Sequence, residues 1–427
     1  MATMPAPTSA TGEQARQTPN RWLIALAAVV AHLCLGSVYA WSIFVEPIGS
    51  LTGWHKPQIT WAFSTAIACL GLTAAFGAKF MQRLGPRRSV LLAGAFFAGG
   101  LLAAGLACMW HSLLLLYGGF GVIGGIGLGL GYAPPVATLL RWFPDKRGLA
   151  TGMAVCGFGG GAMIASQIAE WLLPLIGCSG TFFALAAIYL PLIIVAALAM
   201  RLPPDDFVVR GRAAGNRLAE EVVIPVGVAL RSSRFWLLWG VFYVNIAVGI
   251  MLIALAKPMA QSIGGLSEAG VKVVVPLLAL FNAGGRLGWS SFSDYIGRGG
   301  AFLSMLVLQI VLFTLVPNVQ GVLFVACLTL ILSCYGGGFA LVPAYIADLF
   351  GNRSTGPIYG AALTAWSAAA ISGPPIGAYL VERTGSYWAA IYLACGLLLF
   401  GLIMAFVLHL LPDRQATVFR QSSHGSV

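Results

Sequence analysis

Hydrophobic residues in this chain gather in long runs that are separated by short polar turns. A helix needs about 20 consecutive apolar residues to cross the hydrocarbon core of a bilayer, because it rises only about 1.5 Å per residue. The pattern therefore predicts an all-α membrane protein with twelve transmembrane helices. The predicted spans are residues 22–46, 57–82, 88–110, 112–139, 147–173, 181–201, 233–262, 269–293, 300–317, 319–347, 356–382 and 386–410.

One hydrophilic stretch between spans is much longer than the others and divides the runs into two sets of six. It carries four acidic residues and several arginines, which is typical of a solvated linker. The predicted organisation is a disordered tail over 1–20, a six-helix bundle over 21–201, a linker over 202–232, a second bundle over 233–411 and a tail over 412–427.

Composition and charge agree with a membrane protein and orient it. Of the 427 residues only 9% are charged, whereas soluble proteins average about 25%. The net charge of +11 does not indicate nucleic-acid binding here, because the basic residues lie between apolar runs. Four of the 24 lysines and arginines fall opposite the termini (Lys56, Lys257, Lys272 and Arg383), one lies inside a span, and the rest share the side of the termini. The positive-inside rule then predicts cytoplasmic termini, with the bacterial inner (plasma) membrane as the expected location.

The two sets of six spans carry related turn motifs. Residues 82–88 (QRLGPRR) follow the second span, and 294–298 (DYIGR) follow the eighth. Residues 141–148 (RWFPDKRG) follow the fourth span, and 348–353 (DLFGNR) follow the tenth. Internal repeats of this kind are the mark of transporters that expose a central site to each side of the membrane in turn.

Arg286 lies inside the apolar run 269–293 and is the strongest functional clue. A guanidinium at hydrocarbon depth costs about 2.5–3.5 kcal/mol even on insertion scales, and it cannot lose its proton. Asn282 lies four residues earlier and so shares its helix face. Paired N–H donors match a carboxylate, so we predict that these residues bind a small organic anion. The glycines at 284, 285 and 288 predict close approach by neighbouring helices.

Two motifs resemble a known family. The six-plus-six layout and the paired turns resemble the major facilitator superfamily. Within it, residues 141–152 (RWFPDKRGLATG) and 39–44 (YAWSIF) are similar to the oxalate/formate antiporter family, which includes bacterial relatives of the animal monocarboxylate transporters. The resemblance spans essentially residues 20–410.

This resemblance implies a substrate cavity between the two bundles. The family binds the substrate carboxylate at the position of Arg286, and several aromatic residues match cavity positions or the shared motif, while Phe158 replaces a cavity tyrosine. The predicted substrate-binding residues are Arg286, Asn282, Tyr132, Tyr335, Tyr39, Phe339 and Trp366.

The chain also departs from its relatives at informative positions. Oxalate-specific members have a lysine where alignment places Trp366, so a single central cation argues for a monocarboxylate rather than oxalate. Animal monocarboxylate transporters have an aspartate at the position of Asn282, and asparagine cannot carry a proton. His32 is an alternative carrier, since histidine titrates near neutrality, although a packing role is also open. Gln82 replaces an expected aspartate and weakens one cytoplasmic latch, whereas Asp294 keeps its acid.

The sequence predicts a secondary transporter for lactate, pyruvate, glycolate, formate or a similar acid, working by alternating access as a proton symporter. Carboxylate:carboxylate antiport of the oxalate/formate type is the alternative, and a sensor that does not transport is a further one. Catalytic, ATP-binding and metal-binding motifs are absent, so no enzyme activity, cofactor or metal is expected. The expected partners are the acid, a proton and the lipid bilayer, with the chain a monomer and no nucleic acid involved.

Overall fold

The computed structural model describes residues 20–204 and 224–411, which are helical with no strand. The predicted tails and the central part of the predicted linker lie outside the described residues. Before the linker come α1 (Arg21–Gly36), η1 (Ser37–Ala40), α2 (Trp41–Thr52), α3 (Lys56–Phe76), α4 (Ala78–Trp110), α5 (Leu113–Leu115), η2 (Leu116–Gly124), α6 (Gly125–Trp142) and α7 (Arg147–Ala199). After it come α9 (Val226–Ala229), α10 (Ser233–Ser262), α11 (Glu268–Ile296), α12 (Arg298–Leu315), η4 (Val316–Asn318), α13 (Gly321–Phe350), η5 (Asn352–Ser354), α14 (Thr355–Ala362), α15 (Thr364–Thr384) and α16 (Trp388–Leu410).

Ten helical segments of the described chain are long and apolar enough to cross a membrane. One of them, α7, has 53 residues and would be about 80 Å long if straight. It bends at Gly177, whose positive φ of 68° is not helical, and so makes two crossings. The consecutive helices α14 and α15 could add one more, so the described helices are compatible with the twelve predicted crossings.

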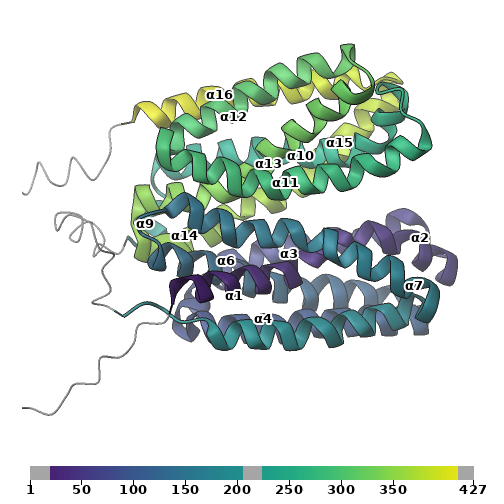
Figure 1. Ribbon diagram of the computed structural model, residues 1–427, viewed down its shortest axis with the longest axis horizontal. Coiled ribbons are helices and arrows are strands. Elements are labelled where there is room, and N and C mark those ends of the chain that lie inside the picture. Colours follow the sequence, from purple (N-terminus) through teal and green to yellow (C-terminus); the bar gives the residue numbers. More distant parts are fainter. Residues whose placement is uncertain (1–19, 205–223, 412–427) are drawn as a thin grey trace, which may run out of the picture.

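The helices form two layers that correspond to the two halves of the sequence. Figure 1 shows α1, α4 and α6 in one layer and α10, α12 and α16 in the other. The halves meet where α7 packs on α11 and where α3 packs on α14 and α15. Helix α1 begins and helix α16 ends at the same end of the molecule (Figure 1), which is called the terminal end below.

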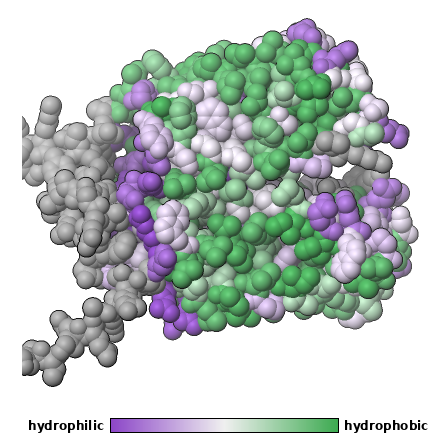
Figure 2. Space-filling view, in the orientation of Figure 1, coloured by the Kyte–Doolittle hydropathy of each residue, from purple (hydrophilic) through white to green (hydrophobic). Residues whose placement is uncertain are grey.

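The outer surface is that of a multi-pass integral membrane protein. Large apolar side chains are exposed on the helices of both halves, among them Leu102 on α4, Val195 on α7 and Phe400 on α16. Figure 2 shows apolar side chains over the middle of the molecule and hydrophilic ones gathered at the ends. A broad apolar band between polar ends is what a lipid bilayer covers.

Only one of the three predicted packing glycines on α11 fills that role. A side chain at Gly285 would collide with the Ser333 backbone of α13, so the helices depend on glycine there. At Gly284 and Gly288 a Cβ would meet nothing within 4 Å, so the prediction was wrong for these two. Both glycines lie on exposed faces of α11, where no neighbouring helix packs against them. In a different contact of α11, Gly152 of α7 lets α7 approach Ser290 and the Arg286 carbonyl.

Candidate functional site

Arg286 is completely buried at the interface between the halves. Among the lysine, arginine, aspartate and glutamate residues whose burial the structure describes, it is the one that is buried. It projects from α11, and Gly159 on α7 leaves space for it, since a Cβ there would lie 3.1 Å from the Arg286 Nε. The long apolar helix thus places a permanent charge at the centre of the protein, as the sequence predicts.

The partners of Arg286 are neutral. Its Nε donates to Asn282 Oδ1 at 3.3 Å, and its Nη1 donates to the Val155 carbonyl of α7 at 3.1 Å. The guanidinium carbon lies 4.8 Å from the centre of the Phe339 ring. The Nη2 atom is buried and has no hydrogen-bond partner, and none of the ion pairs between described residues involves Arg286. The charge is therefore only partly compensated.

Aromatic residues surround the guanidinium in a continuous cluster. Phe339 lies between Tyr335 and Trp366, with ring centres 5.3 and 4.8 Å away. Trp366 in turn contacts Tyr39 at 5.9 Å and Tyr132 at 5.6 Å. These five side chains come from η1, α6, α13 and α15, so the cluster joins both halves of the molecule.

Several polar atoms in this cluster lack partners. The hydroxyls of Tyr39 and Tyr132 and the Nε1 of Trp366 are buried without a hydrogen bond, as is the Nη2 of Arg286. A buried donor with no acceptor costs about 1–3 kcal/mol. All four groups can donate, and a carboxylate accepts several hydrogen bonds at once, so the cluster is complementary to a small anion.

The structure brings all seven predicted site residues into this one cluster, around Arg286. Their role in substrate binding stays a prediction. Other groups were missed: the Val155 carbonyl, which no side-chain motif can reveal, and Tyr359, which lies 6.1 Å from Tyr132 and donates to the Phe339 carbonyl at 3.3 Å. Phe158 was noted only as a replacement, yet its ring contacts those of Tyr39, Tyr132 and Trp366.

His32 lies directly beside the cluster and is fully buried. Its ring stacks on Tyr132, with centres 5.2 Å apart, and meets the edge of Phe158 at 5.9 Å. The Nδ1 atom is 2.7 Å from the Ala154 carbonyl oxygen, and the Nε2 atom is 3.1 Å from the Tyr132 carbonyl oxygen. His32 therefore contacts a residue of the candidate site as well as two backbone carbonyls.

At the terminal end, ion pairs and hydrogen bonds join the halves. Asp294 at the end of α11 accepts from the backbone N–H of Gly148 at 2.9 Å and of Leu149 at 3.1 Å, at the start of α7. Asp348 at the end of α13 pairs with Arg147 at 2.5 Å and with Arg298 at 3.0 Å. These contacts, named here the α7–α11–α13 latch, hold the terminal end closed.

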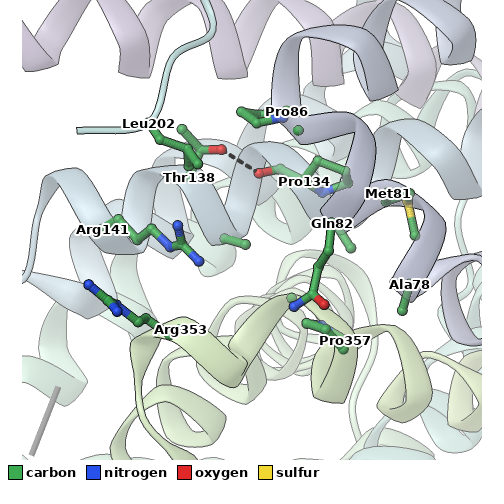
Figure 3. Close-up of a pocket in the computed structure, with 14 residues that line it drawn as sticks. Ala78, Met81, Gln82, Pro86, Pro134, Thr138, Arg141, Leu202, Arg353 and Pro357 are labelled. Carbon is green, nitrogen blue, oxygen red and sulfur yellow. Dashed lines mark hydrogen bonds between the residues drawn. The ribbon is translucent and has the colours of Figure 1, made fainter. Parts of the chain in front are cut away.

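The related position in the other half is occupied differently. Gln82 lines a cavity of about 190 Å³ together with Pro357 at the start of α14. Figure 3 shows Arg141 of α6 and Arg353 of η5 reaching into the same space from opposite halves. Asp294 bonds to the start of α7, whereas Gln82 lines a cavity. This difference agrees with the weaker latch expected from the neutral side chain of Gln82.

Comparison with known proteins assigns the chain to a family. The sequence profile of the Major Facilitator Superfamily matches residues 24–342 and 246–425. The chain belongs to this superfamily. It is a transporter by family and fold rather than an enzyme.

Its relatives include carriers of small carboxylates. The oxalate:formate antiporter of Oxalobacter formigenes is 28% identical over 88% of each chain. Apicoplast pyruvate carrier 1 of Toxoplasma gondii is 26% identical over 82% of each. Monocarboxylate transporter 13 of Rattus norvegicus is 27% identical over 89% of this chain and 87% of its own. The resemblance seen in the motifs thus extends over most of the sequence.

Solved structures support the fold. The proton:xylose symporter XylE matches with a TM-score of 0.70 at 15% identity, over 92% of this chain and 96% of its own. FucP in its outward conformation matches with a TM-score of 0.69 at 13% identity, over 90% and 98%. At such low identity these likenesses speak for the architecture alone.

Proposed function

We propose that this protein transports a small monocarboxylate, such as lactate, pyruvate, glycolate or formate, together with a proton. The carrying observation is the buried, partly compensated guanidinium of Arg286, surrounded by the unsatisfied hydroxyls of Tyr39 and Tyr132. A carboxylate on Nη2 would complete the ion pair, and the hydroxyls would donate to its oxygens. The names of several relatives favour the same class of substrate.

The charge of the site favours one carboxylate over two. Among the basic side chains whose burial the structure describes, Arg286 and His32 are the two that are buried. Trp366 occupies the position where the family resemblance implies a second cation in oxalate carriers. A dicarboxylate would bring a second negative charge into a region of low dielectric with no fixed cation to meet it. The aromatic walls instead suit a short apolar tail.

Transport would proceed by alternating access. Because Arg286 lies on α11 and bonds to Val155 on α7, a bound anion there contacts both halves. Neutralising the guanidinium lowers the cost of closing a dry cavity around it. The α7–α11–α13 latch would then open and close the terminal end. The excess of basic residues beside this end supports the proposal that it faces the cytoplasm. The proposed location is a bacterial inner membrane, with the protein acting as a monomer.

Uptake into liposomes tests this function. Purified protein should carry labelled lactate, pyruvate, glycolate or formate faster than protein-free liposomes do. Arg286→Ala should reduce that carrier-mediated rate at least about a hundredfold, as expected when a charge-assisted pair of roughly 3 kcal/mol is lost. Arg383→Ala, which removes an exposed arginine from α15, should leave it unchanged. Equal rates for wild type and Arg286→Ala would rule out the proposed site.

A second candidate function is exchange of one carboxylate for another. Its support is the 28% identity to the oxalate:formate antiporter. Uptake by exchange requires acid on both sides of the membrane, whereas uptake by symport needs external acid and an inward proton gradient but no internal acid. Uptake into empty liposomes under such a gradient favours symport, and strict dependence on internal carboxylate favours exchange. Binding without any flux would indicate a sensor instead.

A further inference from the structure

His32 has a hydrogen-bond acceptor at each ring nitrogen, in a fully buried site that is otherwise unfavourable for a charge. Both ring nitrogens face carbonyl oxygens, Nδ1 that of Ala154 and Nε2 that of Tyr132. A carbonyl oxygen only accepts hydrogen bonds, and a neutral imidazole has a single N–H to donate. In the neutral form one ring nitrogen therefore presents its lone pair to the lone pairs of a carbonyl. The imidazolium donates from both nitrogens and satisfies both carbonyls.

We propose that His32 binds the proton that crosses the membrane with the carboxylate. This inference rests on the proposed function and names the carrier that Asn282 cannot be. The structure supports it because His32 is buried, faces two acceptors, and stacks on Tyr132, whose hydroxyl belongs to the anion site.

The electrostatics of the surrounding elements link the proton to the anion. Arg286 from α11 is the charged group that acts on His32, and Tyr132 from α6 is the titratable group in contact with it. The contacts from α7 are the neutral Ala154 carbonyl and the Phe158 ring. Burial of the ring opposes protonation of His32 most strongly, and the positive charge of Arg286 adds to it. A carboxylate on Arg286 cancels the contribution of Arg286.

Proton and carboxylate therefore favour each other's binding, and by linkage the effect is reciprocal. The empty site carries the charge of Arg286 alone. The site with both a carboxylate and an imidazolium carries the same net charge, so the loaded and empty proteins cross the same electrostatic barrier.

Proton uptake on binding measures this link directly. Protein in weakly buffered detergent with a pH-sensitive dye is mixed with lactate, pyruvate, glycolate or formate near pH 7.5. Wild type should take up about one proton per bound acid, which follows from one-to-one linkage. His32→Gln, which is close in size but does not titrate in this range, should take up none. His111→Gln, at an exposed position, is the matched control and should behave as wild type.

Transport assays separate failure of this inference from failure of the proposed function. His32→Gln should retain exchange of labelled for unlabelled acid at equal pH, because Arg286 is intact. It should lose the acceleration that a one-unit inward pH gradient gives to wild type. Arg286→Ala should lose both activities. If wild type shows no exchange with any of the acids, the proposed function itself fails.

A folding defect is handled by a second variant. Replacing His55, His111, His409 and His424 by glutamine leaves His32 as the single histidine of the five in the chain. Proton uptake that persists in this variant supports His32 even if His32→Gln does not fold. Undiminished proton uptake in an exchange-competent His32→Gln, or its loss in the variant that keeps only His32, would overturn the inference.

Discussion

At the level of single side chains, the site is defined by donors that the protein leaves unused. Tyr39, Tyr132, Trp366 and Arg286 each bury a polar atom without a partner. Proteins rarely retain such atoms, because each costs free energy that a hydrogen bond would recover. Their convergence on one cluster, rather than any single residue, is what indicates a ligand.

Removal of the unused hydroxyls should weaken binding without weakening the fold. Tyr132→Phe is expected to reduce affinity for the carboxylate by about tenfold to a hundredfold, since a hydrogen bond to a charged acceptor contributes roughly 1.5–3 kcal/mol. Thermal unfolding should occur at an equal or higher temperature, because no bond of the empty protein is lost. Tyr359→Phe is the matched control: its hydroxyl is bonded to the Phe339 carbonyl, so it should lower the unfolding temperature.

Trp366→Lys should broaden selectivity toward dicarboxylates. A lysine at this buried position would add a second cation next to the anion site. We expect competition by oxalate, relative to lactate, to increase at least about tenfold, which corresponds to roughly 1.4 kcal/mol. Trp366→Met has a similar reach without charge and should not favour oxalate. An equal gain with methionine would show that cavity size, not charge, sets the preference.

At the level of helices, the two halves are latched unequally. The carboxylate of Asp294 caps the start of α7, where backbone N–H groups and the helix dipole attract negative charge. On the other side, Gln82 and Pro357 line a cavity. Pro357 has no backbone N–H to donate, unlike Leu149, whose backbone N–H donates to Asp294 in the α7–α11–α13 latch. Opening of the terminal end is thus resisted mainly on the α7–α11 side.

Asp294→Asn should shift the protein toward states that are open at the terminal end. Asparagine keeps the shape but loses the charge that binds the start of α7 and Arg298. Spin labels at the exposed positions Lys146 and Tyr295, in opposite halves, should show a larger population at long distances in a double electron–electron resonance experiment. Gln82→Asn changes an amide for an amide and should leave the distribution as in wild type.

At the level of the complete chain, both halves contribute to the candidate site, Tyr39 and Tyr132 from one and Arg286, Phe339 and Trp366 from the other. In the proposed mechanism, rocking of one bundle against the other changes access to the site without dismantling either bundle's core.

The orientation predicted from charge can be measured separately. With basic residues concentrated beside the terminal end, a fluorescent protein fused after Val427 should fluoresce in bacteria, and an alkaline phosphatase fused there should be inactive. A phosphatase fusion within the turn after α15, near Arg383, should be active. The reverse pattern would contradict the assigned orientation and the cytoplasmic latch.

Much of this architecture follows from sequence alone, because a bilayer imposes strong rules on it. Apolar length predicts the crossings, charge asymmetry orients them, and Arg286 is conspicuous because hydrocarbon tolerates guanidinium poorly. Resemblance supplied the aromatic positions. The sequence pattern gave a wrong prediction where the result depends on neighbours in space. Gly284 and Gly288 are small enough for close helix packing but face open space.

The linear chain by itself determined the number of crossings, the two halves and the presence of one buried cation, since these depend on which residues exist and in what order. Only the tertiary structure decided which groups meet that cation. Backbone carbonyls carry no sequence signature. The contacts of Arg286 with the Val155 carbonyl and of His32 with the Ala154 carbonyl therefore follow only from the packing of α7 against α11 and α1. Whether a polar atom is satisfied is a property of its neighbours in space, and those neighbours lie more than a hundred residues away in the chain.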